Sequence, residues 1–158
     1  MIEPSTHIET EFLMRLHNPG SGGSHAIDSS LMVFHNGAEG RAEGPALKGA
    51  IIAPSGDWLR IMPSGSFRVD ARVMIRTDDG ALIYVSYGGV VSMSQENYAR
   101  MGAGEALTSS DCYFITTPTF QTSHPAYQRL NRIQAIGKIA ALKGGPGGYV
   151  DYDVFAVR

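Results

Sequence analysis

The stretch from Phe67 to Val85 alternates its side chains with period two on both sides of Asp79-Gly80. An Asp-Gly pair between two alternating segments strongly favours a hairpin, because both central residues of a type I′ turn need positive φ. The stretch therefore predicts two long antiparallel strands joined by a two-residue turn. That turn fixes the register, and the expected partners are Arg76 with Ile83, Met74 with Val85, Arg72 with Tyr87, and Asp70 with Gly89.

The two faces of this hairpin differ in chemistry. One face is apolar along the first strand, whereas the other carries Asp70, Arg72 and Arg76 among aliphatic and aromatic groups. Successive side chains of a strand point to opposite faces, so one face can line a polar cavity while the other packs against apolar groups. The hairpin is thus typical of a ligand-holding β-barrel or sandwich.

The rest of the chain repeats this pattern of short alternating segments separated by turn residues. The one clear helical segment is Ser94–Met101, with Ser94 as N-cap and Gly102 as its end, and Pro125–Leu130 can add a helical turn. Many strands with short connections predict an all-β fold, a single antiparallel β-barrel of about eight or more strands with one short helix. The further expected strands are Thr6–His17, Ala26–His35, Leu47–Ala53, Asp57–Met62, Tyr113–Thr117, Asn131–Ala140 (where a helix competes) and Tyr149–Val157.

Length and charge limit the function classes. With 158 residues, the chain is expected to form one domain over residues 1–158. Its formal net charge is -2 without a basic run, so neither nucleic acid nor an anionic membrane is an expected partner. Cys112 is the only cysteine, which excludes an internal disulfide. The first residues show no basic region followed by an apolar core, so the expected location is cytoplasmic.

Nine motifs follow one another along the chain: Gly44–Gly49, Gly56–Trp58, Asp70–Arg72, Arg76–Val85, Tyr113-Phe114, Thr116–Pro118, Phe120, Leu130–Arg132 and Tyr152–Phe155. This ordered set resembles the bacterial and fungal family known as domain of unknown function 3237. The resemblance covers nearly the whole chain, and it implies a small antiparallel β-barrel that often self-associates, with some relatives that look like cofactor-free cyclases, isomerases or lyases. Ile115 and Gln121 stand where arginine and glutamate are common in the family, which implies a less charged pocket.

The charged face of the hairpin supplies the catalytic candidates. In a barrel lumen, Asp70 and Arg72 could pair, and Arg76 could hold a carboxylate or stabilise an enolate oxygen. The alternative is a structural ion pair or a solvent-facing ladder of charges, because exposed charges are commoner. Tyr113 is a fourth catalytic candidate, since a phenol can donate a proton.

Aromatic and polar residues elsewhere are candidates for substrate binding. Each has a structural alternative: a core position for the tryptophan, a rim position for the tyrosines, a half-exposed strand position for the histidine, and a backbone cap for the asparagine. The candidates are Trp58, His35, Tyr87, Phe120, Tyr127 and Asn131.

Metal and nucleotide sites are not indicated. The histidines lack the spacing of a zinc-ligand pair, and the glycine-rich segments Gly20–Gly23 and Gly144–Gly148 match no phosphate loop. We therefore expect neither a metal nor a cofactor.

Two functions remain open. One is a cofactor-free isomerase, cyclase or lyase acting on a small oxygenated or aromatic metabolite in the lumen, through acid-base chemistry and oxyanion stabilisation. The other is a lipocalin-like carrier without turnover. A small-molecule partner and a homo-oligomer are expected in both cases.

Overall fold

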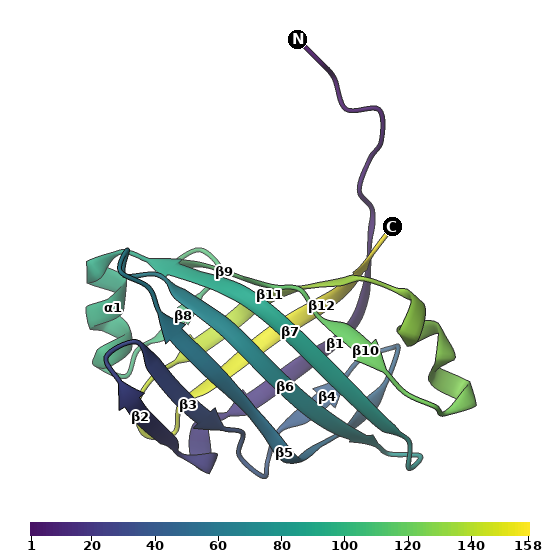
Figure 1. Cartoon of the computed structure of the whole chain (residues 1–158), viewed down its shortest axis with the longest axis horizontal. Helices are drawn as coiled ribbons and strands as arrows, with labels where there is room; N and C mark the ends of the chain where they lie inside the picture. The colour runs from purple at the N-terminus through teal and green to yellow at the C-terminus, as the bar shows by residue number, and fades with distance from the viewer.

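Eight antiparallel strands close into a barrel in the computed structural model, which describes residues 1–158. The predicted fold class is confirmed. Around the barrel the order is β1, β4, β5, β6, β7, β9, β11, β12 and back to β1 (Figure 1). The bounds are β1 Thr10–Pro19, β4 Arg41–Glu43, β5 Lys48–Ile61, β6 Phe67–Thr77, β7 Leu82–Met93, β9 Cys112–Thr116, β11 Ala135–Lys143 and β12 Tyr149–Val157.

Four shorter strands extend the barrel wall. β2 (Ser24–Asp28) and β3 (Leu31–His35) form a hairpin that continues from β5, while β8 (Ala106–Thr108) pairs with β11 and β10 (Thr119–Gln121) with β7. Both β4 and β3 pair with the same edge of β5, with β3 further along the strand. The β2–β3 hairpin therefore lengthens one side of the barrel.

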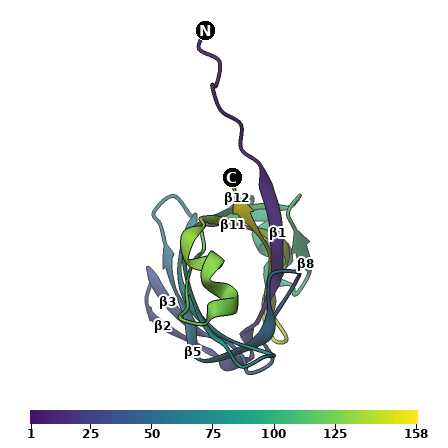
Figure 2. The same cartoon turned by 90° about the vertical axis from the view of Figure 1, so that its right-hand side faces the viewer.

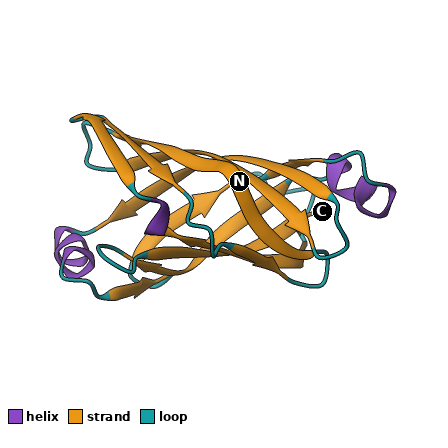
Figure 3. Cartoon of the chain, turned by 90° about the horizontal axis from the view of Figure 1, so that it is seen from below, coloured by secondary structure: helices purple, strands orange, loops and turns teal.

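Helical segments gather at the two ends of the barrel (Figure 3). The helix α1 (Gln95–Gly102) begins at the predicted N-cap, where Ser94 Oγ accepts a hydrogen bond from the Asn97 backbone N–H at 3.1 Å. The 3-10 helix η2 (Pro125–Arg132) lies across the opposite end, as Figure 2 shows. A short 3-10 turn, η1 (Gly20–Gly22), follows β1. No helix is long and apolar enough to cross a membrane.

The barrel interior is apolar. Alternate residues of each strand are buried, and Val73, Ile75, Ile83 and Val85 of the central hairpin are at most 1% exposed. Because the alternation has period two, the same rule places the intervening charged residues outside.

The turn between β6 and β7 differs from the prediction. Three residues, Asp78 to Gly80, form the loop, and only Gly80 has positive φ, at 92°. Thr77 Oγ1 accepts a hydrogen bond from the Ala81 N–H at 2.8 Å and donates one to Asp79 Oδ1 at 2.5 Å, which stabilises this longer loop. The observed partners are consequently Arg76 with Leu82, Met74 with Tyr84, Arg72 with Ser86, and Asp70 with Gly88.

This shift by one residue exchanges the two faces of β7. Tyr87 therefore lies beside Ala71 on the inner face, and not beside Arg72 as predicted. The interior is lined by the apolar face of the hairpin, so the expectation of a polar, charge-bearing hairpin face in the lumen is wrong.

A second difference concerns β5, which was expected as two strands. It continues through Pro54, and an irregularity between Ile52 and Gly56 accommodates the proline. Ser55 stabilises this point, since its Oγ donates to the Ile52 carbonyl at 2.7 Å and accepts from the Met74 N–H at 2.9 Å. The irregularity also sets which side chains of the second half of β5 face inward.

Candidate functional site

A cavity of about 560 Å³ occupies the half of the barrel near α1 and the β2–β3 hairpin. Inward-facing side chains of β3, β5, β7 and β12 form its walls, and the loops after β1 and β11 border it. Most of the lining is apolar, which suits a small organic ligand. The lining includes Met32, Phe34, Leu59, Ile61, Phe67, Val91, Met93, Met101, Phe114, Leu142 and Val150, with the polar groups Asn18, His35, Asn36, Asp57, Tyr87, Lys143, Tyr149 and Tyr152.

Asp57 brings a carboxyl group into this apolar wall. It shares the inner face of β5 with Leu59 and Ile61, whereas Trp58 and Arg60 point outward. Its Oδ1 accepts a hydrogen bond from the Asp70 backbone N–H at 3.0 Å. No lysine, arginine or histidine forms an ion pair with it.

The pKa of Asp57 responds to this burial. Removal from water disfavours the charged form and raises the pKa from 3.8 to about 6, although the Asp70 N–H opposes the shift. A carboxyl group with such a pKa takes up and releases protons near neutral pH, as a general acid or base requires.

Two tyrosines complete the polar part of the cavity. Tyr87 of β7 and Tyr152 of β12 are 6% and 4% exposed, and their ring centroids lie 5.8 Å apart in an edge-to-face arrangement. Phe114 packs edge-on against Tyr152, at 5.2 Å. Burial raises the pKa values of both phenols well above the ordinary 10, and the nearby Asp57 carboxylate raises that of Tyr87 further. Both phenols therefore stay protonated.

The two hydroxyls are free to bind a ligand. Tyr98 and Tyr127 donate their hydroxyl hydrogens to protein groups, whereas no protein group forms a hydrogen bond with the hydroxyl of Tyr87 or Tyr152. A buried hydroxyl that lines a cavity and lacks a partner is suited to donate to an oxygen of a bound molecule. The site thus combines one proton acceptor with two hydrogen-bond donors.

The charged catalytic candidates lie outside this cavity. Asp70 and Arg72 form an ion pair of 3.1 Å on the outer face of β6, with side chains 52% and 48% exposed. Arg76 is exposed on the same face. The expectation that these three residues line the lumen is wrong, because their parity in β6 places them opposite the buried Ala71, Val73 and Ile75.

Trp58 and Tyr113 also face outward. Trp58 is 40% exposed and lies under the Arg72 guanidinium, 5.4 Å from the ring centroid. Tyr113 is 60% exposed on β9, whose inner face carries Phe114 and Thr116. Ile115 likewise lies on the outer face of β9, so it does not alter the polarity of the cavity.

Of the predicted binding residues, Tyr87 and His35 line the cavity. Tyr87 is deep within it, whereas His35 is exposed at the end of β3 and contacts His25 edge-on at 5.3 Å. His35 therefore belongs to the mouth.

The other predicted binding residues lie near the opposite end of the barrel. Phe120 is 7% exposed in the core. Tyr127 of η2 donates its hydroxyl hydrogen to Asp79 Oδ1 at 2.9 Å, and Asn131 exchanges two 2.8 Å hydrogen bonds with the Thr122 backbone. These contacts attach η2 to the barrel, and none of the three residues lines the cavity.

Sequence reasoning missed Asp57 and Tyr152. Both had a usable signal. Tyr152 alternates with Val150, Val154 and Ala156 against two aspartates, and Asp57 alternates with Leu59 and Ile61. A single acidic residue on an otherwise apolar strand face marks a buried carboxyl group.

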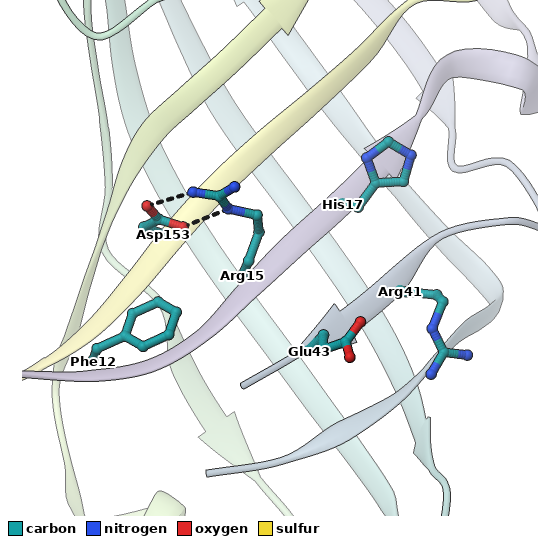
Figure 4. A pocket seen from close by; sticks show the side chains of 6 residues that line it. All are labelled: Phe12, Arg15, His17, Arg41, Glu43 and Asp153. Carbon is teal, nitrogen blue, oxygen red and sulfur yellow. Dashed lines mark hydrogen bonds and ion pairs between the residues drawn. The ribbon is translucent and has the colours of Figure 1, made fainter. Parts of the chain in front are cut away.

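A second, shallower depression of about 350 Å³ lies on the outer surface over β1, β4 and β12 (Figure 4). Most of its charged groups are already paired, since Arg15 binds Asp153 with hydrogen bonds of 2.7 and 2.9 Å and Arg41 lies 3.6 Å from Asp78. No group of three histidine, cysteine or acidic side chains could hold a metal ion. The internal cavity is therefore the stronger candidate.

The fold and this cavity define a closed antiparallel β-barrel whose mostly apolar interior carries one carboxyl group and two phenols. The chain belongs to the family described as protein of unknown function DUF3237, whose model matches residues 8–157. The resemblance noted in the sequence is thereby confirmed.

The curated relatives are named UPF0311 proteins. A UPF0311 protein of Rhodopseudomonas palustris (strain TIE-1) is 32% identical over 101 residues, which cover 64% of this chain and 66% of that protein. A UPF0311 protein of Clostridium acetobutylicum is 33% identical over 89 residues, 56% of each chain. The matched part thus spans between about half and two thirds of these relatives.

Solved structures share the barrel. A β-barrel like protein from Acinetobacter baumannii AYE has a TM-score of 0.79 at 27% identity, with both chains fully covered. A conserved protein of unknown function from Rhodopseudomonas palustris has a TM-score of 0.84 at 24% identity, covering 98% of this chain and all of the other. A structure described as an enzyme from Penicillium herquei has a TM-score of 0.65 at 20% identity over both full chains. At 24% and 20% identity, the similarity to the Rhodopseudomonas palustris and Penicillium herquei structures concerns the fold alone.

Proposed function

We propose that this protein is a cofactor-free enzyme that moves a proton on a small oxygenated metabolite, as an isomerase, cyclase or lyase does. The observation that carries the proposal is that one apolar cavity holds a half-buried Asp57 carboxyl group without an ion-pair partner and two phenols without a hydrogen-bond partner in the protein. Perturbed carboxyl groups in cavities are common at catalytic sites. The enzyme from Penicillium herquei adds that this fold can house an enzyme.

The chemistry assigns one role to each group. The Asp57 carboxylate takes a proton from a carbon next to a carbonyl group, and the C–H electron pair moves into the carbonyl to form an enolate. Tyr87 and Tyr152 donate hydrogen bonds to the enolate oxygen, which an apolar surrounding makes stronger. Asp57 is then protonated and can return this proton to the reacting molecule.

The fate of the enolate distinguishes the three reaction types. Return of the proton to another carbon gives an isomer. Attack of the enolate carbon on an electrophilic carbon of the same molecule gives a ring. Loss of a leaving group from the neighbouring carbon gives an elimination product. All three begin with the same proton transfer to Asp57, so one experiment tests them together.

That experiment measures deuterium uptake by β-tetralone, a small enolisable ketone, in deuterated buffer by proton NMR. We expect the protein to accelerate exchange, and Asp57→Asn to reduce the protein-catalysed rate by about a hundredfold or more. Asp70→Asn is the matched control, because Asp70 is exposed outside the barrel. Exchange no faster than in buffer, or an active Asp57→Asn variant, would contradict the proposal.

The second candidate function is a carrier for a small hydrophobic molecule. The mostly apolar lining favours it. A carrier binds β-tetralone without accelerating its exchange, so the same experiment separates the two functions.

A further inference from the structure

The cavity contains one more group that lacks a partner. Asn18 lies at the end of β1 and lines the cavity, and its Nδ2 is the one side-chain nitrogen or oxygen that has almost no accessible surface and still lacks a hydrogen bond. An unsatisfied buried amide is unfavourable, and proteins rarely retain one without a reason. A ligand oxygen would supply the missing acceptor.

Asn18 is held in place by a second amide. Asn36 Nδ2 donates to Asn18 Oδ1 at 2.7 Å, and the Asn36 backbone N–H donates to the Ser55 carbonyl at 3.1 Å. Next to this pair, the Gly37 N–H donates to the Pro19 carbonyl at 2.9 Å. Because Asn36 occupies the carbonyl oxygen of Asn18, the group of Asn18 left for a ligand is its N–H.

The strand register places Asn18 relative to the phenols. Leu16 of β1 is opposite Tyr152 of β12, and Asn18 is opposite Val150, which is the next inward-facing position. Two residues of a strand advance by about 7 Å. The Asn18 amide therefore lies one side-chain row away from the Tyr152 phenol along the barrel axis.

The charge of the lining limits the part of the ligand between these rows. Asp57 has no cationic partner, so a second negative charge beside it is unfavourable. The one lysine of the lining, Lys143, is opposite Tyr149, one residue beyond the level of Asn18 and Val150, so strand alternation turns it away from the inward-facing rows. Both inner rows thus favour an uncharged molecule.

We propose that Asn18 is a positioning residue that donates a hydrogen bond to a second oxygen of the substrate. The substrate is then an uncharged compound with two oxygen functions at opposite ends of a body about one bicyclic ring long. One oxygen is the reacting carbonyl at Tyr87 and Tyr152, and the other is a hydroxyl or carbonyl at Asn18. The identity of the first oxygen rests on the proposed function.

The test compares two probes, β-tetralone and its analogue with a hydroxyl on the far carbon of the aromatic ring. We expect the wild-type protein to bind the hydroxylated probe about tenfold more tightly, as titration calorimetry measures. Asn18→Leu should remove this preference while leaving the affinity for β-tetralone unchanged. A purely structural role of Asn18 would alter both affinities together and leave their ratio intact.

Two further measurements guard against a folding defect. Asn18→Asp keeps an acceptor for Asn36 but loses the donor, so it should also lose the preference. In the wild-type protein, the Asn18 side-chain amide signal should shift with the hydroxylated probe more than with β-tetralone. Equal affinity of both probes for the wild-type protein, or no binding of either, would overturn the inference.

The outcome is separable from that of the proposed function. Deuterium exchange reports on Asp57, whereas the ratio of affinities reports on Asn18. A protein that prefers the hydroxylated probe but exchanges no deuterium would support the Asn18 site and refute the catalytic role.

Discussion

Asp57 of β5 and Tyr87 of β7 lie on either side of Ala71 in one row of the barrel's inner wall. Two strand spacings separate their backbones, which is about 10 Å. Since the alanine between them carries only a methyl group, space remains above it for a ligand that touches both side chains. The small residue is thus as much a part of the site as the two polar ones.

The tyrosine hydroxyls can be tested by removing only the oxygen atom. Tyr87→Phe and Tyr152→Phe should keep the fold, because no protein group forms a hydrogen bond with either hydroxyl. Each should slow deuterium exchange of β-tetralone by about 100-fold or more, the usual cost of losing one donor to an oxyanion. Thermal melting checks the fold. Full exchange activity in the double variant would remove both phenols from the mechanism.

The fold was predictable because it depends on period-two alternation, which is a local signal. The hairpin from Phe67, the N-cap Ser94 and the last strand all follow from residues close in sequence. The turn after Thr77 was not predictable in the same way. Whether Asp79 adopts positive φ depends on the hydrogen bonds of Thr77 in the folded hairpin.

That single-residue error carried over to the candidate site. It placed Tyr87 on the same face as Arg72, the face that was expected to line the lumen. The density of charge on Asp70, Arg72 and Arg76 suggested chemistry, yet on a barrel strand such a density is typical of the solvated face. The single carboxyl group at Asp57 is the rarer and more informative pattern.

The outer position of Arg72 leads to a prediction about a residue that the sequence offered as a catalytic candidate. Arg72→Met should leave both probe affinity and deuterium exchange unchanged, because its guanidinium contacts the exposed Asp70 and Trp58. Its effect on stability should be below about 1 kcal/mol, as for other exposed ion pairs. Calorimetry and exchange rates check this expectation. A loss of probe binding would mean that the outer face communicates with the cavity.

The β6–β7 turn gives a prediction about stability. Gly80 has a φ of 92° with open space around it, so a β-branched side chain there is disfavoured by the backbone conformation alone. Gly80→Val should lower the free energy of unfolding by about 1–3 kcal/mol. Gly102→Ala is the control, because that glycine also faces open space but has no positive φ. Equal melting temperatures for the wild type and Gly80→Val would refute the assigned turn.

Asp57 makes stability depend on pH in an unusual direction. Its pKa rises from 3.8 in the unfolded chain to about 6 in the folded one, so the folded state binds this proton more tightly. Between about pH 4 and pH 6 the unfolded chain gives up the proton first, and stability falls as the pH rises. Above pH 6 both states are ionised, and the full cost of roughly 1–3 kcal/mol persists.

Asp57→Asn removes this cost and keeps an oxygen that can accept the Asp70 N–H. At pH 7 the variant should be more stable than the wild type by roughly 1–3 kcal/mol, and the difference should disappear near pH 4. Urea unfolding at several pH values measures it, and other titrating groups cancel because they are common to both proteins. A variant that is less stable than the wild type at pH 7 would show that the carboxylate is stabilised in the fold, and it would then be a poor proton acceptor. Higher stability together with lost exchange is the combination expected of a carboxyl group that is retained for catalysis at the expense of the fold.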